Sequence, residues 1–213
     1  NNPNKPVAAI IGGSKVSTKI DVINFLLKKM DIIIIGGAMA NTFVAAKGLD
    51  VGKSLFEKEC IDLAKELIEK SQNNNCNLIL PTDFIVSKKL IKNAEYTTTN
   101  YDSMPHNMMA LDIGPKSIEL INKNINNCKT ILWNGPLGAF ETYPFDKGTN
   151  KVASHVSSLT KQKKILSVAG GGDTVSALNN AKVLNDFSYV STAGGAFLEW
   201  LEGKVLPGIE PIS

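Results

Sequence analysis

The 213-residue sequence contains no arginine, so all 23 of its basic residues are lysines. Arginine supplies the planar, bidentate guanidinium group that usually binds a multiply charged carboxylate or phosphate. A polyanion site in this chain therefore has to use lysine, backbone amides or a metal ion. The net charge of +3 is small and lysine is interleaved with Asp and Glu throughout, so we expect no binding to nucleic acid.

Cysteine and histidine are also scarce. The three cysteines, Cys60, Cys76 and Cys128, are odd in number and widely spaced, which argues against a disulfide framework and against a zinc site. Neither His106 nor His155 has a second His or Cys at ligand spacing, and we interpret both as surface or packing residues. This composition fits the reducing cytoplasm.

Long apolar runs are missing as well. No stretch of 18 apolar residues occurs and no Lys-flanked apolar segment opens the chain, so we expect neither membrane insertion nor secretion. The chain begins with Asn1-Asn2-Pro3 rather than Met, and we expect a processed product or a part of a longer protein. With 43% hydrophobic and 20% charged residues, it can fill one core, which predicts a single domain.

The most informative stretch is 165–177, where a β-prone run ends in Gly170-Gly171-Gly172 and is followed by Asp173, Thr174 and an apolar segment of helical character. This order is typical of a strand, a tight turn and a helix N-terminus, which together bind an anion, most often phosphate. Asp173 alone would repel phosphate, so a cation such as Mg²⁺ between them would account for it. The stretch favours a magnesium nucleotide site. A flexible turn with Asp173 as an ordinary N-cap is the alternative.

The pattern of a strand, a glycine pair and a helix is repeated along the chain. It predicts a parallel α/β sheet whose loops gather at the carboxyl edge of the strands. The repeats are Val7–Ile11 before Gly12-Gly13, Ile32–Ile35 before Gly36-Gly37, and 189–192 before Gly194-Gly195.

Two lysines follow the first of these turns. The sequence predicts a helix that begins at once, with Ser14 as its N-cap, and on that helix Lys15 and Lys19 stack on one side. The helix dipole disfavours cations there, so the two lysines predict a bound anion. Two solvated lysines on a surface helix are the alternative.

The remaining segments are assigned by periodicity and turn residues. We interpret 48–54 as a surface loop, because it has one residue too few between its glycines for a P-loop and follows a helix. The segment 88–107 is a long polar excursion in which we identify no chemistry, with a β-hairpin as one form that it could take. The segment 111–115 is a turn that begins a helix. Further helices are expected at 38–47, 55–72, 147–159 and 196–202, and strands at 78–80, 84–87 and 130–133.

The loop 134–141 joins small and rigid residues to Glu141, which could accept hydrogen bonds from two ribose hydroxyls; a solvated loop carboxylate is the alternative. A dinucleotide-binding oxidoreductase is disfavoured, because no glycine cluster has the G-x-G-x-x-G spacing and Val190 stands 20 residues beyond Gly170. A non-catalytic binding module gives no reason for Lys15 and Lys19 to face the pocket. Phosphoryl transfer gives such a reason, since its catalysis depends mainly on positioning the moving group and neutralising its charge.

Six motifs together resemble phosphoglycerate kinase, in the order found in that family and over nearly the whole chain. The resemblance is to the C-terminal, nucleotide-binding half only. It implies that residues 1–213 form a three-layer Rossmann-like α/β domain with a six-stranded, mainly parallel sheet, and that the N-terminal substrate domain is absent. The motifs are Gly12–Lys19, Gly36–Ala40, Leu111–Pro115, Trp133–Pro136, Gly170–Thr174, and Leu201–Lys204 with Leu206–Gly208.

The resemblance implies a glycolytic kinase of the cytoplasm that reversibly transfers a phosphoryl group from 1,3-bisphosphoglycerate to MgADP, giving 3-phosphoglycerate and MgATP. The acidic substrate would bind through the missing N-terminal domain. We therefore expect this chain to be a monomer that binds ADP or ATP with Mg²⁺ without turnover. A stand-alone nucleotide sensor or assembly module is the alternative.

The resemblance also assigns roles around the phosphates. Lys19 would contact the nucleotide phosphates and Lys15 would steady the transferring phosphoryl group, to which Gly194 and Gly195 would offer their amides. Asp173 would hold Mg²⁺. Beside it on the phosphates would lie Thr174 and the helix N-terminus at Gly171 and Gly172.

The remaining implied roles concern the nucleoside. Glu141 would bind the ribose hydroxyls and Asn134 would lie against the phosphate chain. Ala110 stands where the family often has glycine, which could narrow the adenine slot; Ala193 and Thr18 also depart from the commoner pattern. The slot itself would be walled by Gly36, Gly37, Leu111, Pro136 and Ala139.

Overall fold

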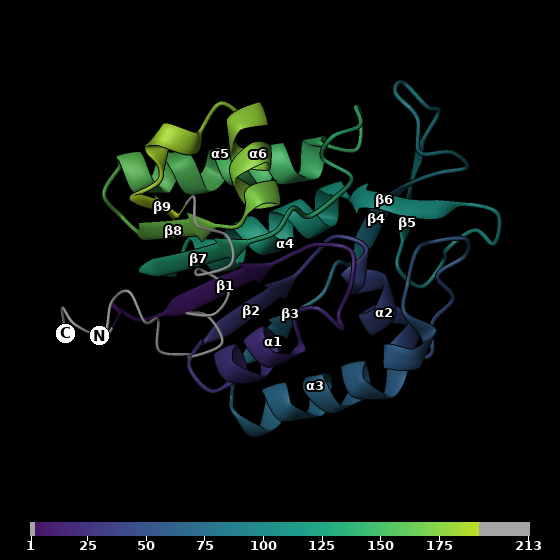
Figure 1. Ribbon diagram of the computed structural model, residues 1–213, viewed down its shortest axis with the longest axis horizontal. Helices are drawn as coiled ribbons and strands as arrows, with labels where there is room; N and C mark the ends of the chain where they lie inside the picture. Colours follow the sequence, from purple (N-terminus) through teal and green to yellow (C-terminus); the bar gives the residue numbers. More distant parts are fainter. Residues whose placement is uncertain (1–2, 192–213) are drawn as a thin grey trace.

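The computed structural model describes residues 3–191, which form three layers around a six-stranded sheet (Figure 1). Neighbouring strands run parallel throughout, in the order β3-β2-β1-β7-β8-β9. The predicted fold class is confirmed. The strands are β1 (Val7–Ile11), β2 (Ile32–Ile35), β3 (Asn77–Ile79), β7 (Thr130–Asn134), β8 (Leu166–Gly170) and β9 (Tyr189–Ser191).

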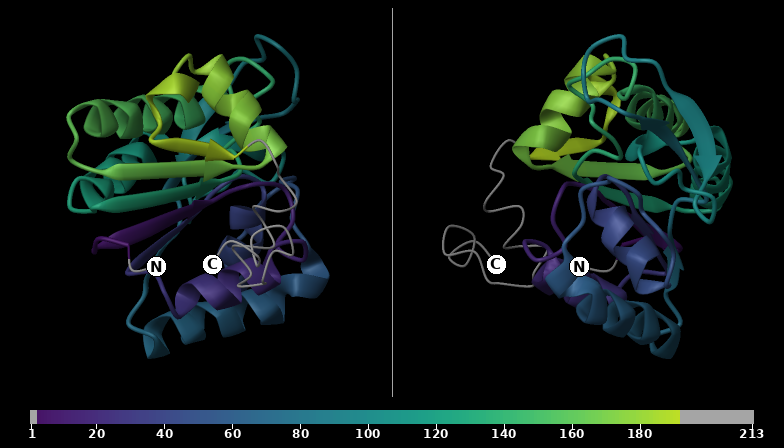
Figure 2. Two further views of the ribbon diagram at one scale, coloured as in Figure 1. Left: turned by 60° about the vertical axis from the view of Figure 1, so that its left-hand side comes forward. Right: turned by 90° about the vertical axis from the view of Figure 1, so that its right-hand side faces the viewer.

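Helices cover both faces of this sheet, as Figure 2 shows. One face carries α1 (Ile20–Leu27), α2 (Met39–Ala46) and α3 (Ile61–Asn73), the last preceded by a short 3₁₀ turn η1 (Lys58–Cys60). The other carries α4 (Pro115–Ile125), α5 (Lys147–Lys161) and α6 (Gly172–Asn180), followed by η2 (Leu184–Asp186). None of the helices within 3–191 is both long and apolar enough to cross a membrane.

Alternating side chains explain why the central strands are continuous apolar runs. Ile10 and Trp133 pack among the residues of α4, α5 and α6, whereas Ile11 and Leu132 pack against α1, α2 and α3. Strands buried on both faces in this way have no polar face, which is the usual condition of parallel sheets. The short runs in the sequence therefore sufficed to locate them.

The connections place a crevice at the middle of the sheet. The chain builds outward from β1 through β2 to β3, then returns to β7 on the other side of β1 and continues to β8 and β9. The direction of winding thus changes between β1 and β7. In open α/β sheets, ligands bind outside the carboxyl ends of the strands at such a switch point.

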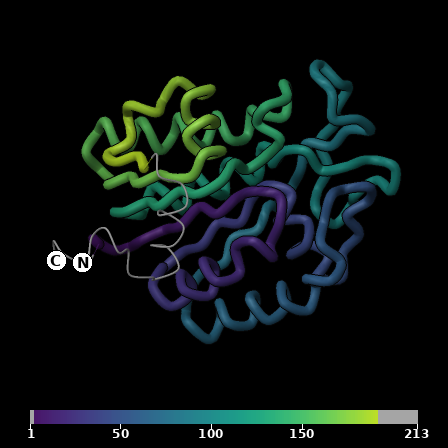
Figure 3. Tube along the Cα trace, in the orientation of Figure 1, coloured from purple at the N-terminus to yellow at the C-terminus, as the bar shows by residue number. Residues whose placement is uncertain are grey.

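A second, antiparallel sheet stands beside this edge, formed by β4 (Asp83–Ser87), β5 (Thr97–Asn100) and β6 (Met109–Ile113) in the order β5-β4-β6. Figure 3 shows the connection between β4 and β6 reaching away from the six-stranded sheet. The prediction that 111–115 is a turn was wrong. Its first three residues end β6, which pairs with β4, and only Gly114 separates that strand from α4.

The predicted start of the first helix was also wrong. α1 begins at Ile20, with Lys19 at its N-cap, so Lys15 lies in a preceding loop and the two lysines do not stack on one helix. That loop is a turn in which the Lys19 amide donates to the Val16 carbonyl at 2.9 Å. The Ser17 amide donates instead to Glu57, 40 residues further along the chain, at 3.0 Å.

Two other expectations need adjusting. The helix expected from residue 55 begins at Ile61, after η1. The loop 48–54 is not a P-loop, as predicted, but it is more than a surface loop, because Val51 and Ser54 are buried and the Ser54 hydroxyl accepts the Ala110 amide at 2.8 Å. The expected helix at 196–202 lies outside the described residues.

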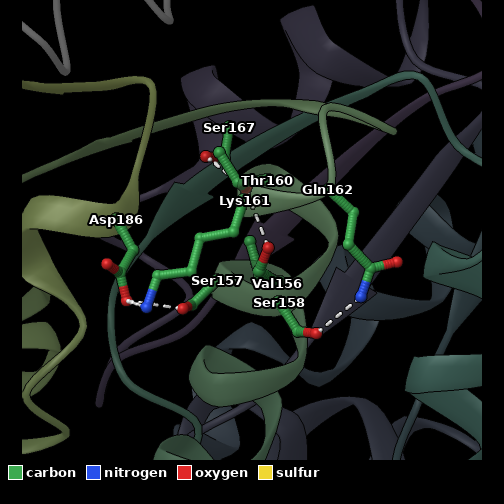
Figure 4. Close-up of polar contacts among 8 residues, drawn as sticks. All are labelled: Val156, Ser157, Ser158, Thr160, Lys161, Gln162, Ser167 and Asp186. Carbon is green, nitrogen blue, oxygen red and sulfur yellow. Dashed lines mark hydrogen bonds and ion pairs between the residues drawn. The ribbon is translucent and has the colours of Figure 1, made fainter.

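Polar contacts fasten the carboxyl end of α5, as Figure 4 shows. The Ser157 hydroxyl and the Lys161 ammonium both reach Asp186 Oδ2, at 2.6 and 2.8 Å. The Thr160 hydroxyl lies 2.9 Å from that of Ser167 on β8. These contacts fix the C-terminal end of α5 to η2 and β8. The N-terminus of α5 lies at the opposite end, at the carboxyl edge of the sheet.

The N-terminus of α4 is held by a residue of another strand. Asp83, at the start of β4, is only 1% exposed, and its carboxylate accepts the amides of Lys116 at 3.0 Å and Ser117 at 2.7 Å. These are first-turn amides of a helix that has no side-chain cap of its own at Gly114. Asp83 therefore connects the antiparallel sheet to the main layer of helices.

We expect Asp83→Ala to lower the free energy of unfolding by about 2–4 kcal/mol, because it leaves buried amides without their charged acceptor. Urea denaturation followed by circular dichroism measures this change. Glu119→Ala is the matched control, since Glu119 is an exposed carboxylate on the same helix. Equal effects of the two substitutions would contradict this account of the cap.

Candidate functional site

An open cleft of about 350 Å³ lies at the carboxyl edge of the six-stranded sheet. Its walls come from the loops after β1, β2 and β7, from the antiparallel sheet and from the first turn of α6. The cleft thus lies at the switch point identified above. Of the residues assigned from the sequence, it is lined by Gly37, Leu111, Pro136, Ala139, Glu141 and Asp173.

One part of the cleft is walled by backbone. The Gly37 amide donates to the Leu137 carbonyl at 3.0 Å, and the Gly13 amide donates to the Pro136 carbonyl at 3.1 Å. A Cβ on Gly37 would lie 2.4 Å from the Gly13 carbonyl oxygen, and behind it a Cβ on Gly36 would meet the Leu137 side chain. Glycine is therefore required for this close approach, which leaves a smooth wall for a flat ring.

Apolar side chains complete this part of the cleft, and sequence reasoning missed most of them. Leu55 and Leu90 line it although their side chains are 61% and 47% exposed. From the sequence, Leu55 was interpreted as the start of a helix and Leu90 as part of a polar excursion without chemistry. The only sign that either lines a cleft was a large apolar residue in a polar stretch. Ala110 also lies in the wall. Further lining residues that sequence reasoning did not assign are Asn41, Phe84, Met109, Asp112, Leu137, Gly138, Phe140 and Thr142.

Asp112 is a buried acidic side chain at the base of the cleft. Burial raises its pKa to about 8, and the nearby Asp146 acts in the same direction, although the amides of Gly148 and Ile113 oppose the shift. The Gly148 amide, in the first turn of α5, donates to it at 2.6 Å. Asp112 thereby joins β6 to the N-terminus of α5 beneath the cleft.

Lys19 lies at the polar end, between β1 and β7. Its ammonium donates to the carbonyls of Gly12 at 2.7 Å and Asn134 at 3.3 Å, and to the Asn134 side-chain oxygen. Burial lowers the pKa of Lys19 from 10.5 to about 8, and the charge of Asp173 opposes this shift. Lys19 is thus a partly buried cation at the switch point.

The α6 N-terminus faces the same region. Gly171 is the N-cap, with φ of +99°, and no side chain caps the first turn, in which Gly172 meets open space. The buried Thr174 hydroxyl accepts the Gly135 amide at 2.7 Å, and the Asn134 amide donates to the Gly170 carbonyl at 2.8 Å. The first-turn amides are therefore open to an anion.

The remaining residues assigned from the sequence either lie near the cleft or fall outside the described residues. Lys15 is exposed in the loop beside Ser14, which lines the cleft, and Glu141 is exposed on the cleft wall. Lys15 and Lys19 therefore flank the cleft rather than line it. Gly194 and Gly195 lie outside the described residues.

Asp173 is the residue assigned to a metal ion. Within residues 3–191 no group of three or more His, Cys, Asp and Glu residues gathers as a metal site. Asp173 is nevertheless exposed at the edge of the cleft, in the first turn of α6 and next to its uncapped amides. Its single carboxylate fits Mg²⁺, which commonly binds one or two carboxylates and takes its other oxygens from phosphates and water.

Comparison with known proteins shows the family. The family model for phosphoglycerate kinase matches residues 1–204. Phosphoglycerate kinases of Brucella melitensis and Methylorubrum extorquens are 54% identical over 209 residues and 55% over 210; the matches cover 98% and 99% of this chain. They cover 53% and 52% of those proteins, so the chain spans about half the length of these relatives.

Solved structures agree. The structure of phosphoglycerate kinase from Coxiella burnetii matches 99% of this chain and 53% of its own, with 45% identity and a TM-score of 0.94. The structure of phosphoglycerate kinase from Pyrococcus horikoshii matches 97% of this chain and 51% of its own, with 25% identity and a TM-score of 0.80. Sequence and fold together show that the chain belongs to the phosphoglycerate kinase family.

Proposed function

We propose that this chain is the C-terminal, nucleotide-binding domain of a phosphoglycerate kinase and that the cleft binds ADP or ATP with Mg²⁺. The observation that carries the proposal is the position of Lys19, a partly buried ammonium at the switch point, near enough to Asp173 in the uncapped first turn of α6 for their charges to interact. A cation and open amides at one end of an apolar cleft suit a molecule with a flat ring and a phosphate tail.

The proposed orientation follows from this polarity. The adenine ring lies between the backbone wall at Gly37 and the apolar side chains around Leu111, and the ribose hydroxyls reach Glu141. Pro136 and Ala139 complete the slot. The glycine wall is flat, so a planar ring can pack against it more closely than a branched group can. We therefore place the adenine ring at this wall.

The phosphates lie at the other end. They are bound by the amides of Gly171 and Gly172 and by the first turn of α6 at Thr174. Lys19 and Asn134 contact the phosphate chain at the ends of β1 and β7. Lys15 reaches the terminal, transferring phosphoryl group from its loop. Asp173 holds Mg²⁺, which supplies positive charge that neutralises the phosphate oxygens.

The reaction of the whole protein would be reversible phosphoryl transfer between 1,3-bisphosphoglycerate and MgADP, a step of glycolysis in the cytoplasm. The proposed part of this chain is to bind and orient the nucleotide and to neutralise its charge. The acidic substrate would bind in the N-terminal domain that the relatives' greater length accommodates. We propose a monomer without nucleic acid or membrane partners.

Calorimetry of MgADP binding tests the proposal. We expect Lys19→Ala to weaken binding by about tenfold or more, since hydrogen bonds to a charged group contribute about 1.5–3 kcal/mol. Lys28→Ala, which removes an exposed lysine just after α1, should leave the affinity unchanged. Thermal unfolding of each variant verifies its fold. Absence of binding by the unsubstituted chain, or equal binding by both variants, would contradict the proposal.

The affinity for MgADP should depend on pH. Lys19 is protonated below its pKa of about 8, so binding should weaken as the pH rises through about 8, by about tenfold between pH 7 and 9.5. Asp112 also has a pKa of about 8 and lines the cleft. Repeating the titration with Lys19→Ala separates the two groups, because only the Lys19 component disappears. A profile unaffected by this substitution would rule Lys19 out.

We expect the 213-residue chain to show no turnover, because the acidic substrate would bind in the N-terminal domain rather than in this one. A coupled assay with MgATP and 3-phosphoglycerate measures this directly, with a full-length phosphoglycerate kinase as the positive control. Rates comparable to that control would refute the proposed division of labour between the two domains.

A further inference from the structure

A carboxylate from a distant segment holds the loop that carries the two lysines. Glu57 lies between α2 and η1, and its Oε2 accepts the Ser17 amide at 3.0 Å while its Oε1 accepts the Ser17 hydroxyl. Partial burial favours the neutral acid. Hydrogen bonds from the Ser17 hydroxyl and from the Ser17 and Val16 amides, with the charge of Lys15, outweigh this and lower the pKa of Glu57. The group is therefore a carboxylate at neutral pH.

Glu57 itself stands on a rigid support. Its amide donates to the Thr42 hydroxyl at 3.1 Å, and the Asn41 side chain donates to the Leu55 carbonyl at 3.0 Å. Asn41 and Thr42 belong to α2 and are 1% and 0% exposed. The segment 55–57 is thus fixed to α2, and through Leu55 and Asn41 it also borders the cleft.

The loop that Glu57 contacts has little other support. Ser14, Lys15, Ser17 and Thr18 are exposed, and Val16 alone is buried. Among the side chains within 3–191 that lie outside the loop, only that of Glu57 forms hydrogen bonds with residues 14–18. Without it, the loop would be anchored only by Val16 and by its two ends.

We propose that Glu57 is a positioning residue that fixes this loop so that Lys15 faces the terminal phosphate of a bound nucleoside triphosphate. The inference rests on the proposed function, which assigns Lys15 to that phosphate. A carboxylate near a phosphate site weakens anion binding by its charge alone. Glu57 therefore contributes through geometry, by holding the backbone at Val16 and Ser17.

The ratio of the affinities for MgATP and MgADP isolates the terminal phosphate, and it is a readout that general loss of stability does not move. We expect Lys15→Ala to lower the preference for MgATP by about tenfold, and Glu57→Ala to lower it by about threefold to tenfold. In the Lys15→Ala background, Glu57→Ala should change the ratio by less than about twofold, because both act through one group.

Two further variants separate geometry from charge. In Glu57→Gln the amide oxygen can still accept the Ser17 N–H and the amide nitrogen can donate to the Ser17 hydroxyl, so this variant should keep the ratio within about twofold of the original. Glu59→Ala removes an exposed carboxylate of η1 and should change nothing. Calorimetry with both nucleotides gives the ratios, and thermal unfolding verifies the fold of each variant.

The outcomes are distinct. If Lys15→Ala lowers the ratio but Glu57→Ala leaves it unchanged or raises it, the inference is overturned and the proposed function stands. Equal losses in Glu57→Ala and Glu57→Gln would also overturn it, because the hydrogen-bonding geometry that glutamine retains would then not be what positions Lys15. If Lys15→Ala itself leaves the ratio unchanged, the assignment of Lys15 fails and the inference fails with it, whereas the proposed nucleotide site is still tested by Lys19→Ala.

Discussion

The arrangement of the cleft depends on one partly buried interaction, the three hydrogen bonds from the Lys19 ammonium to the ends of β1 and β7. These strands meet at the switch point, where parallel strands direct carbonyl oxygens and loops toward the same edge. The ammonium stabilises the carbonyls of Gly12 and Asn134, to both of which it donates. It also leaves the site with a cation whose low pKa makes its charge sensitive to pH.

Buried acidic side chains perform the corresponding role on the other side of the cleft. Asp83 holds the first turn of α4, and Asp112 holds that of α5, each from a strand of the antiparallel sheet. The antiparallel sheet is therefore joined to the main body through helix N-termini rather than through strand pairing. Because β6 supplies both the cleft wall at Leu111 and the acidic side chain of Asp112, the wall cannot move without disturbing α5.

The sequence predicted those features that local physics determines. Apolar runs such as 32–35 are sufficient to locate strands buried on both faces, and the glycines after them located the edge where the cleft lies. The grouping of Asp173 with Glu141 around one cleft also followed from the order of strands and turns. The family assignment is shown independently by sequence and by fold.

What the sequence could not predict depends on contacts between distant residues. The loop at 14–19 takes its shape partly from Glu57, so its local pattern suggested a longer helix than the chain forms. β6 exists because it pairs with β4, more than 20 residues earlier, and its own residues resemble a turn. Leu55 and Leu90 reach the cleft only through the packing of the antiparallel sheet and the segment after α2.

The central claim is that the cleft at the switch point binds a magnesium nucleotide. A crystal structure of the chain grown with MgADP tests it most directly. The account predicts the base against Gly37 and Ala139, the phosphates at the N-terminus of α6 near Lys19, and the metal ion beside Asp173. A nucleotide bound elsewhere, or a metal ion that does not contact Asp173, would contradict it.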